Sequence, residues 1–282
     1  MTTETWRLLD TGCADGYTNM AIDEAILLSC ARGLTPPTLR FYRWKPTCLS
    51  VGFFQSIERE VDVEECCRRG VDVVRRPTGG RAVLHDAEVT YSVAMGENHP
   101  LGCGSIPESH RKIGSVLSTG LRSMGIEAQM APRLVRGLHD EQEGEVRRGR
   151  TPACFDVPSD YEITVEGRKL VGSAQARKHG GLLQHGSILL DVDLPTTLAL
   201  LRLRREVPDV RLVQSLARRI VGLRQVLGRD VSHEHVVRAI VEGFKQCVGI
   251  SFELGELTDE ERLLAEQLRR DKYSAREWNY RR

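Results

Sequence analysis

The sequence predicts an α+β fold, in which a mixed, largely antiparallel β-sheet is flanked by helices. Strand-like and helix-like segments follow one another irregularly along the 282 residues, and tight turns rather than helices join several neighbouring strands. The composition, 40% hydrophobic and 28% charged, is that of a folded globular chain. Because no Gly-, Ser- or Pro-rich linker divides it, we expect a single domain over residues 1–282, with a core at about 34–250 and a helical C-terminal extension packed on that core.

The first part of the chain predicts two helices separated by two strands. Thr18 is a suitable N-cap for the first helix, and Gly33 follows its last turn. The predicted ranges, in chain order, are a helix over 18–31, strands over 38–44 and 49–54, and a helix over 57–69 that stops at Gly70.

The next segments predict hairpins and one long helix. Apolar residues recur at helical spacing between Glu108 and Met124. Gly167 suits the positive φ of a tight hairpin turn. The predicted ranges are a strand–turn–strand unit over 71–86, a strand over 89–94, a helix over 108–124, a hairpin over 161–172, strand-like residues over 181–193, and a mainly helical remainder with a short strand at 250–254.

Residues 132–153 predict a long loop, because glycines and prolines lie among mixed charges without any apolar period. Cys154 follows directly, between Pro152 and Pro158. The eight cysteines form no CxxC pair, so we expect mostly free thiols and no metal site. The default role of each is a small buried hydrophobe, but a partly exposed thiol near positive charge can be a nucleophile.

The charge balance limits the classes of partner. A net charge of +1, from 40 basic and 39 acidic residues, provides no overall field that would attract nucleic acid or an anionic membrane. The N-terminus lacks a signal-peptide pattern, and no apolar run is long enough to span a membrane. We therefore expect a cytoplasmic protein, monomeric and without nucleic-acid or membrane partners.

Two segments carry residues suited to chemistry. In RRPTGGRAVLHD (75–86), Gly79 and Gly80 would let the backbone approach a ligand, and the arginines would donate to its oxygens. This segment is neither a P-loop nor a dinucleotide-binding turn, and a glycine turn with solvated arginines is the alternative. In RKLVGSAQARKHGGLLQHGSILL (168–190), Lys169 lies among apolar residues. It could act as a base, stay charged and stabilise a thiolate, or simply be an exposed strand lysine.

Together these segments resemble the lipoate/biotin transferase and ligase superfamily. The resemblance extends to the opening WRLLDTGCADGYTNMAIDEAIL, to RFYRW and LSVGFFQ, and to the terminal KYSAREWNYRR, and so covers nearly the whole chain. PACFDVPSDYEITVEGRKLVGSAQ is similar to the octanoyltransferases whose nucleophilic cysteine precedes the lysine. Arg81 replaces the third glycine of the superfamily motif, which would crowd a nucleotide phosphate site and lowers the odds of an ATP-using ligase.

The resemblance implies the superfamily's catalytic-domain fold and an acyltransferase that needs no cofactor. Cys154 would take octanoyl from octanoyl-acyl carrier protein as a thioester, beside the cationic Lys169. It would then pass the group to a lysine of a lipoyl-domain protein such as the glycine cleavage H protein. The acyl-binding residues implied are Arg76, Gly79, Gly80, His85, Gly172, Ser173, Ala174, Gln175, His185 and Gly186.

Three alternatives remain at this point. One is an amidotransferase that moves octanoyl from the H protein to the lipoyl domains of 2-oxoacid dehydrogenases. The second is an ATP-dependent lipoate-protein ligase, and the third is a non-enzymatic module that binds a lipoyl domain or carrier protein. For the enzymes, we also expect the 132–153 loop to close over the acyl chain.

Overall fold

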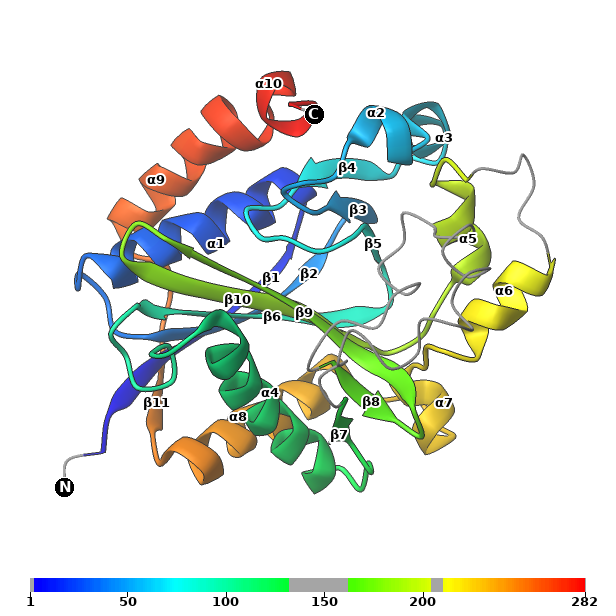
Figure 1. The fold of residues 1–282 in the computed structure, drawn as a ribbon. Coiled ribbons are helices and arrows are strands. Elements are labelled where there is room, and N and C mark those ends of the chain that lie inside the picture. Colours follow the sequence, from blue (N-terminus) through cyan, green and yellow to red (C-terminus); the bar gives the residue numbers. More distant parts are fainter. Residues whose placement is uncertain (1–2, 132–161, 204–209, 282) are drawn as a thin grey trace.

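The structure is a computed structural model that describes residues 3–131, 162–203 and 210–281. Its centre is an eight-stranded sheet in the order β11-β1-β2-β6-β10-β9-β8-β7, with helices on both faces (Figure 1). Within this sheet, the pairs that β1 makes with β11 and β2 are parallel, and the other pairs are antiparallel. The predicted α+β class with a largely antiparallel sheet is confirmed.

The strands of the large sheet come from the whole length of the chain. They are β1 (Thr5–Ala14), β2 (Thr38–Trp44), β6 (Glu88–Gly96), β7 (Gln129–Met130), β8 (Ile163–Val165), β9 (Arg168–Lys178), β10 (Gly181–Leu189) and β11 (Ser251–Leu254). A second, three-stranded sheet has the order β4-β3-β5 and consists of β3 (Cys48–Val51), β4 (Asp72–Arg75) and β5 (Val83–His85).

The helices divide between the two faces of the large sheet. α1 covers one face, with α9 packed outside it, and α4 and α8 cover the other (Figure 1). The helices described are α1 (Gly16–Ala31), α2 (Ile57–Glu60), α3 (Val63–Arg68), α4 (Ile106–Ser123), α5 (Leu194–Ala199), α6 (Val210–Ala217), α7 (Leu223–Leu227), α8 (His233–Val248), α9 (Asp259–Leu268), the π-helical turn η2 (Arg269–Tyr273) and α10 (Arg276–Asn279). None of the helices in the described ranges is long and apolar enough to cross a membrane.

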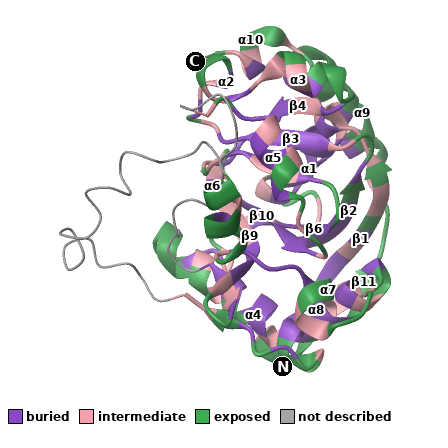
Figure 2. Ribbon diagram, turned by 90° about the vertical axis from the view of Figure 1, so that its right-hand side faces the viewer, coloured by how far each residue is buried: buried purple, intermediate pink, exposed green. Residues whose placement is uncertain are grey.

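Side chains along the central strands alternate between the two faces of the sheet, so each face has its own hydrophobic core. Leu39 and Phe41 point from β2 toward α4 and α8, whereas Arg40 and Tyr42 point toward α1. Figure 2 shows that buried residues continue along the central strands, while exposed residues gather on the outer sides of the helices. The α1 face therefore contains polar side chains that are removed from water, and the functional site is built there.

Two local predictions were wrong. The first helix begins at Gly16, because the Asp15 carboxylate caps it by accepting the Thr18 amide at 2.7 Å. The single helix predicted over 57–69 is two helices, α2 and α3. Between them Val61 is extended and forms a β-bridge with Leu201, so the tertiary pairing interrupts the helical pattern.

The predicted hairpin turn between β8 and β9 is present. Both turn residues have positive φ, 52° at Glu166 and 75° at Gly167, which is the type I′ geometry that matches strand twist. The strand after the turn runs on to Lys178, beyond the predicted end at residue 172. Lys169 pairs with Thr164 of β8 at the start of this strand, and Gly172 to Ala174 follow in a continuous ladder with β10.

The C-terminal segment is attached to the predicted arginine loop by Arg75. This side chain is fully buried. It donates to the carbonyl oxygens of Gly52, Phe53 and Gln55 on one side, and of Trp278 and Asn279 on the other. Since an unpaired buried guanidinium would be costly, these carbonyl oxygens fix the chain after β3 and the chain end against each other.

Candidate active site

The ten residues that the sequence analysis assigned to acyl binding surround one cavity. The cavity has a volume of about 370 Å³, within the range of roughly 300–1,000 Å³ typical of small-molecule sites. The predicted residues in its lining are Arg76, Gly79, Gly80, His85, Gly172, Ser173, Ala174, Gln175, His185 and Gly186. Segments about a hundred residues apart thus meet at one place, while the acyl-binding role of these residues stays a prediction.

The cavity runs from the surface toward the α1 face of the sheet. Gly80 and Ile106 in its lining are exposed, whereas Met20 and Tyr42 are almost completely buried. Trp44 adds an indole ring that stacks on His85, with ring centroids 4.0 Å apart. One end is therefore open to solvent, and the other is lined by apolar and aromatic groups that suit a hydrocarbon chain.

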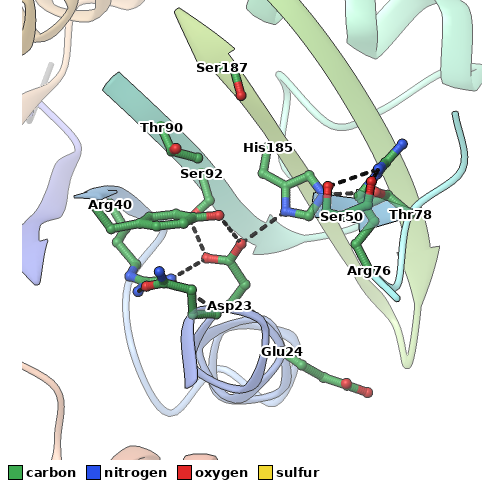
Figure 3. A network of polar contacts seen from close by, with 12 residues as sticks. Asp23, Glu24, Arg40, Ser50, Arg76, Thr78, Thr90, Ser92, His185 and Ser187 are labelled. Carbon is green, nitrogen blue, oxygen red and sulfur yellow. Dashed lines mark hydrogen bonds and ion pairs between the residues drawn. The ribbon is translucent and has the colours of Figure 1, made fainter. Parts of the chain in front are cut away.

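A buried carboxylate on α1 organises the inner end of the cavity (Figure 3). Asp23 is fully buried and pairs with Arg40 at 2.6 Å. It also accepts hydrogen bonds from Tyr42 and Ser92, at 2.9 and 2.7 Å, and its second oxygen lies 2.9 Å from Nδ1 of His185. Burial alone would raise the pKa of Asp23, but the Arg40 guanidinium and these hydrogen bonds hold it below its ordinary value.

His185 connects this carboxylate to the glycine loop. Burial lowers the pKa of His185 despite its contact with Asp23, so the imidazole is neutral at neutral pH. Its Nδ1–H then donates to the Asp23 carboxylate, and Nε2 accepts from the Thr78 hydroxyl at 2.7 Å. Because Thr78 precedes Gly79, the chain from Asp23 through His185 positions the glycine loop over the cavity.

A second chain of the same polarity starts from Glu88 on β6. Its carboxylate accepts from Nδ1 of His85 at 2.8 Å, and Nε2 of His85 lies 2.7 Å from the Ser50 hydroxyl. The Ser50 hydroxyl oxygen accepts a hydrogen bond from the Arg76 guanidinium at 3.0 Å. The Ser50 hydroxyl proton can therefore be donated to Nε2 of His85. Burial alone would raise the pKa of Glu88, but His85 and the hydroxyls of Thr90 and Ser187 hold it low. Both predicted histidines thus anchor the loop through carboxylates.

Arg76 is engaged with its own loop. Its guanidinium donates to the carbonyl oxygens of Gly79 and Arg81, at 2.8 and 2.7 Å. Gly80 has φ of +92°, and a Cβ on Gly52 would lie 1.9 Å from the Gly80 oxygen. Glycine is therefore required at both positions for the loop to fold back on the chain that follows β3. These contacts assign Arg76 a role in shaping the cavity wall.

Lys169 lies beside the cavity and is buried, which excludes the exposed-lysine interpretation. Its ammonium forms an ion pair with Glu162, and about 6% of each side chain is exposed. A Cβ on Gly172, which lines the cavity, would lie 3.2 Å from Nζ of Lys169. Glycine at position 172 thus leaves room for the ammonium next to the cavity. Cys154 and the 132–153 loop lie outside the described residues.

Sequence reasoning missed the carboxylates that organise the site. Asp23, Glu88 and Glu162 are all buried, and none belongs to the two motifs that were singled out. One signal was available for Asp23, because an acid in the apolar run MAIDEAIL must be paired when it is buried. Its partner Arg40 lies on another element, so spacing in the sequence could not identify the pair.

We expect the stability of the protein to fall on acidification through about pH 6.5, the pKa of an unperturbed histidine. Burial lowers the pKa of both His185 and His110 in the folded protein. Below pH 6.5 the unfolded chain therefore binds more protons than the folded one, and the free energy of unfolding decreases. Urea denaturation between pH 5 and 8 would measure this slope, and His185→Gln should reduce it. An unchanged slope in that variant would contradict the assignment.

Comparisons with known proteins agree with this geometry. The model of the family "Lipoyl protein ligase A/B catalytic domain" matches residues 15–245. An octanoyltransferase LipM from Kyrpidia tusciae is 50% identical over 280 residues, covering 99% of both chains, and one from Moorella thermoacetica is 48% identical over 282 residues, covering all of both. A solved structure from a study of a bipartite lipoate protein ligase and its E2 lipoyl domain from Thermoplasma acidophilum superposes with a TM-score of 0.80. It is 27% identical, over 98% of this chain and 96% of that one. The chain therefore belongs to the lipoyl protein ligase A/B catalytic-domain family and, as a full-length relative of the LipM octanoyltransferases, to their branch of it.

Proposed function

We propose that this octanoyltransferase of lipoate biosynthesis carries the octanoyl group as a thioester on Cys154. The donor is octanoyl-acyl carrier protein, and the acceptor is a lysine of a lipoyl-domain protein such as the glycine cleavage H protein. The observation that supports this most directly is that all ten predicted residues line one cavity, with the buried Lys169 packed against its Gly172 wall. An apolar inner end and an open outer end suit an acyl chain that enters tail first.

The reaction consists of two exchanges at one carbonyl carbon. The Cys154 thiolate attacks the donor thioester, and the carrier's thiolate leaves. The neutral amine of the target lysine then attacks the acyl-enzyme, Cys154 leaves as a thiolate, and the amine's proton is released. Because an amide is more stable than a thioester, the transfer needs no ATP. Lys169, as a cation, stabilises the thiolate in both steps.

Intact-mass spectrometry with donors supplied one at a time tests this proposal. Octanoyl-acyl carrier protein should add the mass of one octanoyl group to the enzyme, and peptide mapping should place it on Cys154. Octanoyl-H protein supplied alone should not acylate the enzyme. Labelling by the H protein only would make the enzyme an amidotransferase, and no adduct from either donor would contradict the acyl-enzyme mechanism.

The likeness to a solved lipoate protein ligase favours an ATP-dependent ligase as the second candidate. That activity would use free octanoate and ATP and would survive Cys154→Ala. Arg81 in the cavity wall argues against it, because this side chain stands where the superfamily motif has a third glycine. Transfer of free octanoate with ATP by the Cys154→Ala variant would establish the ligase instead.

Lys169→Ala should raise the pH at which Cys154 is alkylated and slow formation of the acyl-enzyme. Removal of a nearby cation destabilises the thiolate, and a rise of one pKa unit reduces its fraction about tenfold at neutral pH. The alkylation rate with iodoacetamide, measured from pH 5 to 10, gives the profile. Lys169→Arg keeps the charge and should shift the profile less. Identical profiles for wild type and Lys169→Ala would remove the electrostatic role.

A further inference from the structure

A cluster of rings and cations borders the glycine loop on the outside of the cavity. We call it the aromatic–cation surface: Phe53, Phe54, Lys178, Trp278 and Arg281. The Lys178 ammonium lies 4.2 Å and the Arg281 guanidinium 4.0 Å from the centroid of the Phe53 ring. Phe54 packs edge-on against Phe53 and is itself 68% exposed. The surface thus presents a large apolar ring to solvent beside two cations.

The positive charge of this surface is not balanced locally. Within the described ranges, no carboxylate forms an ion pair with Lys178 or Arg281. The adjacent Lys272 is neutralised by Glu24, at 2.6 Å. Burial lowers the pKa of Lys178, and the neighbouring Lys272 and Arg281 add to that effect against the opposing influence of Glu24. Because Glu24 is already paired with Lys272, Lys178 and Arg281 give this surface an excess of positive charge, which favours an anionic partner.

The surface is continuous with the wall of the cavity. The Phe53 amide donates to the Thr78 carbonyl oxygen, inside the glycine loop, at 2.8 Å. Lys178 lies on the same face of β9 as Ala174, which lines the cavity. At about 3.3 Å per strand residue, the four residue steps from one to the other correspond to about 13 Å. The aromatic–cation surface therefore lies beside the cavity and adjoins its wall.

This separation discriminates between the two protein substrates. A lysine side chain advances about 6 Å from its own backbone, at about 1.25 Å per bond, so an acceptor domain must sit directly over the thioester. A phosphopantetheine arm has roughly three times as many bonds and reaches about 18 Å. A donor with this arm can therefore dock at the aromatic–cation surface and still deliver its acyl group to the cavity, whereas the short lysine requires the acceptor domain to cover the cavity itself.

We propose that the aromatic–cation surface docks the acidic face of the acyl carrier protein that donates the acyl group. Phe54 is the apolar contact, and Lys178 and Arg281 pair with carboxylates around the carrier's prosthetic group. This inference rests on the proposed function, since it assumes that a carrier protein loads the enzyme.

The test is a double charge reversal, Lys178→Glu with Arg281→Glu, assayed with two donors. With octanoyl-acyl carrier protein, KM for acylation should rise by about tenfold to a hundredfold, and its salt dependence should flatten. With the small donor octanoyl-N-acetylcysteamine, acylation should proceed at the wild-type rate, which also shows that the variant is folded. Arg238→Glu, an exposed substitution on α8 at the opposite face of the sheet, should leave both reactions unchanged.

The outcomes separate the two proposals. If the wild-type enzyme forms no adduct with either donor, the proposed function fails, and the docking proposal fails with it. If the double variant uses octanoyl-acyl carrier protein as well as the wild type does, only the docking proposal is overturned. Normal loading followed by slow transfer from the isolated acyl-enzyme to a lipoyl domain would assign the surface to the acceptor and also overturn the docking proposal.

Discussion

Replacement of Cys154 by alanine should abolish acyl-enzyme formation and reduce octanoyl transfer by at least about 10³-fold. Without the thiol, the acceptor amine would have to attack the donor thioester directly, with both proteins bound at the same time. The variant retains the cavity but lacks the covalent acyl-enzyme, which separates loading of the enzyme from transfer to the acceptor. Intact-mass spectrometry detects the missing adduct, and gel-shift or mass analysis of the lipoyl domain detects the missing product.

Other cysteines provide matched controls for this result. Cys13 and Cys103 are exposed free thiols outside the cavity lining. Cys13→Ala and Cys103→Ala should therefore acquire the octanoyl adduct at the wild-type rate. Cys154→Ser should accumulate little acyl-enzyme, because a serine hydroxyl without a strong base is a much weaker nucleophile than a thiolate. Full transfer by Cys154→Ala would end the assignment of Cys154 as nucleophile.

Asp23→Asn should lower the free energy of unfolding by about 3–5 kcal/mol, the usual cost of removing one partner from a buried ion pair. The fully buried Arg40 would keep its charge without a counter-ion. The amide would also have to replace a carboxylate that accepts from Tyr42, Ser92 and His185. Urea denaturation monitored by tryptophan fluorescence measures the loss. Transfer activity should fall as well, since His185 would no longer hold Thr78 and the glycine loop in place.

A double variant distinguishes loss of the ion pair from general damage to the core. Asp23→Asn with Arg40→Met removes both charges and should recover part of the lost stability, because no unpaired ion is left buried. Glu166→Gln, which removes a surface partner of Arg168, should change stability by less than about 1 kcal/mol. A cost for Asp23→Asn as small as for Glu166→Gln would show that the buried pair does not hold the site together.

Local patterns in the sequence predicted most of the elements. The strand predicted over TLRFYRW, the helical spacing between Glu108 and Met124, and the turn at Gly167 all correspond to observed structure. Predictions failed where a distant residue decided the local conformation. Val61 leaves the helical pattern because it pairs with Leu201, and β9 extends to Lys178 because β10 lies beside it along its length.

The sequence by itself determined the fold class, the family and the residues that line the cavity, because those residues lie in short motifs that resemble those of the superfamily. Only the tertiary structure decided what holds them in place. Asp23 and His185 are 162 positions apart, and His85 and Ser50 are 35 apart. Strand register and the packing of α1 on the sheet bring these side chains within hydrogen-bonding distance. A buried carboxylate is stable only where such partners converge, and that convergence depends on the three-dimensional arrangement of the strands and not on spacing along the chain.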